Sequence, residues 1–265
     1  LVSHRGREHL DEVCLADMGH LRGCLIYMYK KYDILKGDKS ERVLDRRFIT
    51  NLCMNGVPMG LQYSITAIGS TILQAAVNTL GSTYVAAMTA GSKMFNFTCC
   101  PFDALGSTMA TYAGQNVGAA KIKRLGQGVR SAMIIGSVYS VLSLIALYFT
   151  TDYIALLFVN ASETTIIALT RQFILASACF YIPLTGVNVV RFCIQGMGFS
   201  VFAISAGILE MIGRAFAAII LIPSIGFMGA CLASPIAWIA ADAFLFPAFI
   251  HCAKKLNARH NIKSN

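Results

Sequence analysis

Residues 128–150 read GVRSAMIIGSVYSVLSLIALYFT, and the only charged residue in this stretch is Arg130, close to its start. At 1.5 Å per residue, a helix of this length crosses the roughly 30 Å hydrocarbon core of a bilayer. Five further stretches are similarly long and apolar: 52–80, 85–113, 164–190, 201–222 and 229–250. The sequence therefore predicts an all-α membrane protein with six transmembrane helices.

The composition agrees with a membrane protein. Hydrophobic residues make up 56% of the 265 residues, and charged residues make up 13%, against about a quarter in soluble domains. No nucleophile elbow, phosphate-binding loop or zinc-binding helix motif occurs, so we expect neither enzyme activity nor catalytic residues. The nine cysteines lack the spacing of a metal site, and we expect no metal site and no cofactor beyond a transported ion.

Lys and Arg are distributed asymmetrically between the connections. Basic residues cluster before the first span, after the second and after the last, whereas residues 81–84, 151–163 and 223–228 contain none. The positive-inside rule then places both termini in the cytoplasm, and we expect a bacterial cytoplasmic membrane. Because this topology explains the net charge of +9, the charge does not indicate a nucleic-acid partner, and the expected partner is the lipid bilayer.

Polar residues share one face of the second span. At 100° per residue, a sector of about 80° contains Thr89, Lys93, Asn96, Cys100, Asp103, Ser107, Thr111 and Gly114. Ionisable groups at bilayer depth are costly and suggest function. We expect Lys93, Asn96 and Ser107 to line an aqueous cleft, with Asp103 as a cation or proton site. The alternative is hydrogen bonding between neighbouring helices.

The first span has a weaker polar sector. Asn55, Gln62 and Thr66 fall within about 80° of one another, and we predict that they line the same cleft. Irregular packing around Pro58 is the alternative.

Further ionisable groups lie in or next to the later spans. Glu210 and Arg214 have the spacing of a helical ion pair, and Glu210 is also a candidate coupling residue. Asp242 has no partner in its own helix, so it is either a coupling carboxylate or a residue near the inner boundary. Arg171 and Arg191 lie close enough to the ends of spans to extend to the interface.

An ordered set of motifs resembles the multidrug and toxic compound extrusion (MATE) family over about residues 25–255. The motifs are GVPM at 56–59 with Gln62, NTLG at 78–81, GQNVGAAK at 114–121, QGMG at 195–198, Glu210 with Arg214, and residues 226–238. The resemblance implies two six-helix lobes around a central cleft, and export of organic cations or drugs in exchange for Na⁺ or H⁺.

Within this family pattern the chain resembles the second, C-terminal lobe, so its expected partners are an organic cation and a missing N-terminal lobe. We divide the chain into an unassigned N-terminal segment (1–24), a basic cytoplasmic interlobe segment (25–51), the six-helix lobe (52–250) and a basic cytoplasmic tail (251–265).

The GQNVGAAK motif predicts a turn at the inner surface. Gly114 and Gly118 would allow the chain to turn sharply, and Gln115 and Asn116 would satisfy backbone groups there.

One departure from the family affects the expected coupling site. Some branches have an acid two turns beyond the Gly-x-Pro of the first span, where this sequence has Thr66. Coupling would then use Asp103, Glu210, Asp242 or a carboxylate of the missing lobe. Lys93 supports one alternative, a related flippase for lipid-linked oligosaccharide. A further alternative is a non-transporting membrane fragment, a scaffold or a six-helix channel.

Overall fold

The structure, a computed structural model, describes residues 22–23, 26–27, 30–31, 45–160 and 162–264, without the side chains at 48, 51, 55 and 259–264. The chain divides into two compact units, Leu1–Asn51 and Leu52–Asn265. The second unit holds the helical bundle and the candidate site.

The described residues form helices and contain no strand, which confirms the all-α prediction. The elements are α2 (Arg46–Asn78), α3 (Ser82–Gly118), α4 (Lys123–Ala155), α5 (Thr164–Ala178), α6 (Tyr181–Gly196), α7 (Ser200–Phe216), the π-helical turn η3 (Ala217–Leu221), α8 (Ile222–Ile225) and α9 (Phe227–Ser264). Helix α9 continues through most of the predicted tail, where Ala, Lys and Leu are good helix formers.

Several of these helices have the length and composition of membrane spans. Lys123–Ala155, Ser200–Ile225 and Phe227–Ala258 qualify singly, and α5 with α6 forms a fourth span if the bent pair is counted as one. Helices α2 and α3 have 33 and 37 residues, but they are not apolar enough to qualify. The membrane-protein class is confirmed, and the count of six spans stays a prediction.

The predicted span at 164–190 is broken in the structure. Helices α5 and α6 meet at 52° around Cys179 and Phe180. Pro183 lacks an N–H group, so the first turn is the position in a helix where it costs no hydrogen bond. The break before Tyr181 places Pro183 in the first turn of α6, which accounts for the position of the bend.

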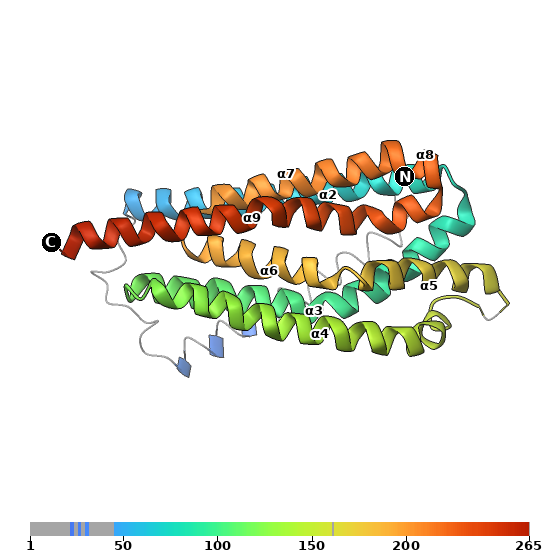
Figure 1. Ribbon diagram of the computed structural model, residues 1–265, viewed down its shortest axis with the longest axis horizontal. Helices are drawn as coiled ribbons and strands as arrows, with labels where there is room; N and C mark the ends of the chain where they lie inside the picture. The colour runs from blue at the N-terminus through green and yellow to red at the C-terminus, as the bar shows by residue number, and fades with distance from the viewer. Residues whose placement is uncertain (1–21, 24–25, 28–29, 32–44, 161, 265) are drawn as a thin grey trace. The chain divides into compact units, whose positions relative to one another are not determined.

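Helix α6 lies between α3 and α9 in the bundle (Figure 1). Its apolar side chains are fully buried at Val187, Val189, Val190, Cys193 and Ile194. Its last residue, Gly196, passes close to α3, because a Cβ at this position would collide with the carbonyl oxygen of Ala110. The position of α6 therefore depends on a residue without a side chain.

The reversal between α3 and α4 follows the predicted turn residues instead of including them. Gly114, Gln115, Asn116 and Gly118 all lie within α3, whose end is closed by Lys121 N–H donating to the Asn116 carbonyl at 2.8 Å. The left-handed residue of this cap is Ala120, with φ 59°. The prediction of a turn within residues 114–118 was wrong, because helical hydrogen bonding continues through both glycines.

We expect Gly196→Ala to destabilise the bundle by about 1–3 kcal/mol, because the added methyl group forces α6 away from α3. Thermal unfolding of the purified protein in detergent measures the change. Gly118→Ala is the matched control, since nothing lies within 4 Å of a Cβ at Gly118. Equal melting temperatures for the two variants would contradict the close approach.

Candidate functional site

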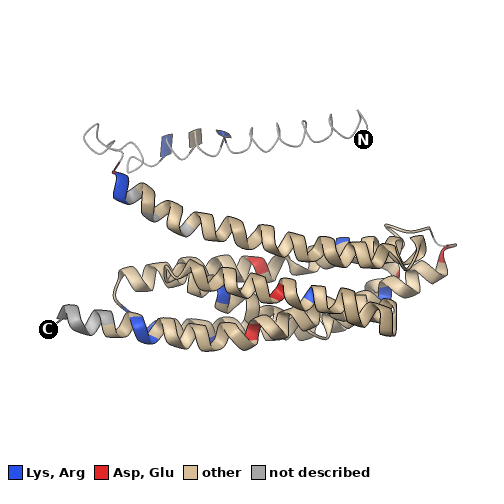
Figure 2. Ribbon diagram, turned by 90° about the horizontal axis from the view of Figure 1, so that it is seen from above, with Lys and Arg blue, Asp and Glu red and all other residues tan. Residues whose placement is uncertain are grey.

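The polar face predicted on α3 is exposed along its full length. All eight of its residues are exposed: Thr89, Lys93, Asn96, Cys100, Asp103, Ser107, Thr111 and Gly114. Its hydroxyl groups donate to carbonyls of their own helix, as Ser107 does to the Asp103 carbonyl at 3.0 Å. Figure 2 shows the charged residues as isolated bands on otherwise uncharged helices. The described helices of this chain leave the face uncovered.

The opposite face of α3 packs into the bundle. Met94, Phe102, Met109 and Ala113 are buried there, and the Phe102 ring meets the ring of Tyr181 edge-on at 5.4 Å between centroids. Helix α3 is therefore held by its apolar face against α5, α6 and α4. This packing leaves the polar face of α3 available for contacts outside the described helices.

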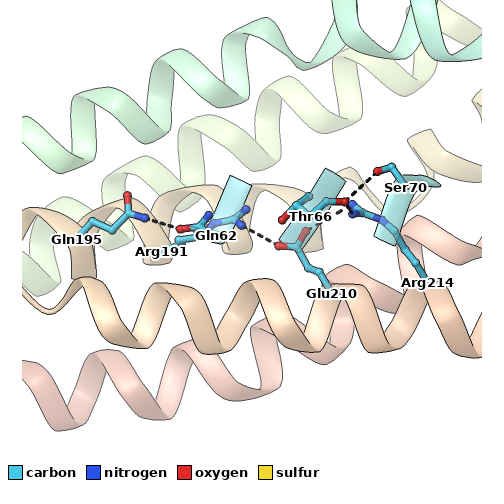
Figure 3. Close-up of polar contacts among 7 residues, drawn as sticks. All are labelled: Gln62, Thr66, Ser70, Arg191, Gln195, Glu210 and Arg214. Atoms are coloured by element: carbon cyan, nitrogen blue, oxygen red, sulfur yellow. Dashed lines mark hydrogen bonds and ion pairs between the residues drawn. The ribbon is translucent and has the colours of Figure 1, made fainter. Parts of the chain in front are cut away.

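The polar sector of α2 faces the interior of the bundle. Gln62 is 3% exposed, and its Oε1 accepts a hydrogen bond from Gln195 Nε2 at 2.6 Å. The carbonyl of Thr66 accepts from Arg214 Nη1 at 3.1 Å. Figure 3 shows Gln62 and Thr66 pointing toward side chains of α6 and α7. The predicted lining residue Asn55 has its side chain outside the described residues.

Glu210 is held by two arginines inside the bundle (Figure 3). Its Oε1 accepts from Arg191 Nη1 at 2.8 Å, and its Oε2 lies 3.4 Å from Arg214 Nη2. The Glu210 side chain is 3% exposed and each arginine side chain 10%. The ion pair predicted between Glu210 and Arg214 is confirmed. The three groups carry a net charge of +1, because one carboxylate faces two guanidinium groups.

Neither arginine that was expected to extend to the interface is a simple surface residue. Arg191 was predicted to extend outward from a span end, but it is buried and pairs with Glu210. A charge buried in an apolar bundle is stabilised by a fixed counter-charge, which accounts for its inward direction. Arg171 forms an ion pair with Asp152, and both side chains are partly exposed.

Asp242 lies against α6, where a glycine leaves space for its carboxyl group. A Cβ at Gly186 would come within 2.6 Å of Asp242 Oδ2, so a larger residue at position 186 would force the carboxyl group to move. Its Oδ1 is buried and has no hydrogen-bond partner among the described residues. Asp242 is therefore placed inside the bundle.

A cavity of about 130 Å³ joins the exposed and buried polar groups. Its lining comes from α2, α3, α6 and α7 and consists of Gln62, Tyr63, Thr66, Asp103, Asn188, Arg191, Phe192 and Glu210. The structure thus brings together Gln62, Thr66, Asp103 and Glu210, four of the residues that the sequence singled out. The roles predicted for them in lining and coupling stay predictions.

The contribution of α6, with Asn188 and Arg191 in the cavity lining and Gln195 bonded to Gln62, was not predicted. Asn188, Arg191 and Gln195 follow one another at spacings of three and four, so they share one helix face. That spacing was a usable signal. Only Arg191 of the three is charged, and its position near a span end suggested an interfacial role.

Lys93 lies at a different cavity from Asp103. A cavity of about 610 Å³ is lined by Thr89, Lys93, Phe158 and Glu163, among others. The Lys93 ammonium lies 5.5 Å from the centre of the Phe158 ring. Two charges of the polar face are therefore separated, each beside its own cavity.

Comparison with known proteins identifies related sequences. Residues 58–220 match the family model described as MatE. A 147-residue segment is 25% identical to a protein of Bacillus subtilis (strain 168) named "Probable multidrug resistance protein YoeA", and it covers 54% of this chain and 32% of that protein.

Solved structures have the same fold. The chain aligns with the Vibrio cholerae MATE transporter VcmN in its bent form at a TM-score of 0.72 and 18% identity, over 81% of this chain and 49% of that one. A MOP superfamily transporter from Pyrococcus furiosus gives a TM-score of 0.66 and 16% identity, over 74% and 43%. This chain spans about a third of the curated relative's length and about half the length of these structures.

We expect Glu210→Gln to destabilise the protein by about 3–5 kcal/mol, because two buried guanidinium groups would lose their shared carboxylate. Thermal unfolding in detergent measures the loss. Glu163→Gln removes an exposed acid at the start of α5 and is the control. An unchanged melting temperature for Glu210→Gln would show that the arginines do not depend on this carboxylate.

Proposed function

The chain belongs to the MatE family, and we propose that it forms one lobe of a secondary transporter that exports organic cations or drugs in exchange for Na⁺ or H⁺. Family membership and the named relative support efflux in general terms. The exported molecule and the coupling ion are part of the proposal, because the chain spans only part of these relatives. The proposed partners are the lipid bilayer, an organic cation and a second lobe, and we propose a cell membrane with both termini in the cytoplasm.

The exposed polar face of α3 is the observation that supports this proposal best. A face that carries Lys93 and Asp103 at bilayer depth is costly against lipid. Water in a cleft between two lobes would remove that cost, because it hydrates the polar groups. The face therefore suits a cleft wall through which a hydrophilic ion and an amphiphilic substrate pass.

Asp103 is the coupling carboxylate that we favour. Glu210 is already neutralised by two arginines, and Asp242 is enclosed against Gly186. Asp103 is exposed on the polar face and also lines the inner cavity. Among these three candidates it is the carboxylate that an ion and a cationic substrate can both reach.

The energetic basis of exchange is competition for this charge. A proton or Na⁺ at Asp103 removes the attraction for a cationic substrate, and the substrate in turn excludes the ion. Each ligand shifts the transporter only as far as its affinity differs between the inward- and outward-facing states.

The environment of Lys93 favours efflux over the flippase alternative. A site for a lipid-linked pyrophosphate needs an excess of positive charge. The cavity beside Lys93 also contains Glu163, and the ammonium group is directed at the Phe158 ring. The local charge is thus balanced, which is a weak basis for binding an anion.

We expect Asp103→Asn in the full-length protein to abolish ion-coupled efflux and to leave membrane insertion unchanged, because the exposed amide keeps its size but loses its charge. Efflux of the cationic dye ethidium, driven by an imposed pH or Na⁺ gradient, measures coupling. Asp152→Asn, which lies outside the cavity, is the control. Efflux with normal pH and Na⁺ dependence in Asp103→Asn would defeat the assignment.

We expect Cys100 to become accessible to thiol reagents from both sides of the membrane during transport, because its face alternates between them. A variant that keeps only Cys100 is labelled with a membrane-impermeant maleimide from each side. A variant that keeps only the buried neighbour Cys99 is the control. Labelling of Cys100 from one side alone, with or without substrate, would support a scaffold instead.

A further inference from the structure

Arg191 has an N–H group that its ion pair does not use. Its Nη1 donates to Glu210, but Nε is buried and has no partner among the described residues. A buried donor without a partner destabilises the folded protein. Because Arg191 lines the cavity of about 130 Å³, the unused donor calls for a polar group on the cavity side.

The cavity can supply that group through water. Its volume matches about four water molecules at roughly 30 Å³ each. Thr66 also lines this cavity, and its Oγ1 is buried without a partner among the described residues, so the lining offers several polar atoms to bridge. Water here would connect the guanidinium of Arg191 to whichever charged groups reach the same space.

The charge balance identifies the group at the other end. Arg191, Glu210 and Arg214 sum to +1, and Arg214 is already bonded to Glu210 and to the Thr66 carbonyl. Asp103 lines the same cavity and forms no ion pair among the described residues. The excess positive charge therefore faces a carboxylate that has no fixed partner.

We propose that Arg191 is a tethered counter-cation for Asp103, which competes with the coupling ion for this carboxylate across the shared cavity. The inference rests on the proposed role of Asp103 in coupling. When no ion is bound, Arg191 balances both Asp103 and Glu210. When a proton or Na⁺ neutralises Asp103, Arg191 balances Glu210 alone. Arg191 is thus a positioning residue that sets the affinity of the site for the ion.

The competition takes place among a small set of neighbouring groups. The titratable groups that share the cavity with Asp103 are Tyr63 on α2, Arg191 on α6 and Glu210 on α7. Cys99 and Cys100 lie beside Asp103 on α3, and Arg214 on α7 and Asp242 on α9 interact electrostatically with Arg191 and Glu210. The two positive groups of this set are both arginines, and Arg214 is not part of the cavity lining. Removing Arg191 therefore removes the positive charge that lines the cavity.

The test is Arg191→Gln, which leaves Glu210 paired with Arg214. We expect the pH midpoint of ethidium efflux to rise by roughly one unit, because a carboxylate without a nearby positive charge binds a proton more tightly. If Na⁺ is the coupling ion, the half-saturating Na⁺ concentration falls roughly tenfold for the same reason. Arg171→Gln removes an arginine outside the cavity and should leave both values unchanged.

Asp103→Glu supplies a second test on an exposed position, which keeps the proposal falsifiable if Arg191→Gln does not fold. A free Glu carboxyl group has a pKa about 0.4 above that of Asp. If Arg191 had no influence on this site, Asp103→Glu would therefore raise the pH midpoint of efflux slightly. A longer side chain brings the carboxylate closer to Arg191, so our proposal expects the midpoint to fall. A rise would overturn the inference.

The outcomes separate this inference from the proposed function. Normal ion dependence in Asp103→Asn would overturn the role of Asp103 itself. Loss of ion dependence in Asp103→Asn, with identical midpoints for wild type, Arg191→Gln and Arg171→Gln, would overturn only the role of Arg191. A purely structural role for Arg191 would lower the amount of folded protein without moving the midpoint.

Discussion

The Glu210 carboxylate is the point on which the inner part of the bundle depends. It neutralises two buried guanidinium groups, one from α6 and one from its own helix α7. Arg214 extends the same network to α2 through the Thr66 carbonyl. Three helices are therefore joined at one carboxylate in an apolar environment, where an unpaired charge would cost several kcal/mol.

This network explains why two similar polar patterns have different environments. Both α2 and α3 carry polar residues at helical spacing, and the sequence predicted a cleft wall for each. On α2 the pattern is used inside the bundle, because Gln62 and Thr66 provide partners for Gln195 and Arg214. On α3 the side chains of the polar face form no hydrogen bond or ion pair with another helix among the described residues, and that side stays exposed.

Sequence reasoning was therefore reliable for the class of the fold and weaker for the partners of each polar group. Apolar stretches alone predict long helices, and the ion pair between Glu210 and Arg214 follows from spacing within one helix. The pairing of Arg191 with Glu210 joins two helices, and no local pattern encodes which helices become neighbours. The break at residues 179–180 likewise depends on Pro183 together with the packing of α6 against its neighbours, and a local pattern does not encode that packing.

The contrast between α2 and α3 has a consequence for how a transporter could work. An ion that binds at an exposed carboxylate changes the structure only if the charge is felt by groups that hold helices together. The cavity shared by Asp103, Arg191 and Glu210 provides that contact, because Arg191 belongs both to the cavity and to the network that joins α6 to α7. Under the proposed coupling at Asp103, neutralising this carboxylate would change the balance of charge at a helix junction, and the effect of the ion would reach the packing of the lobe through Arg191.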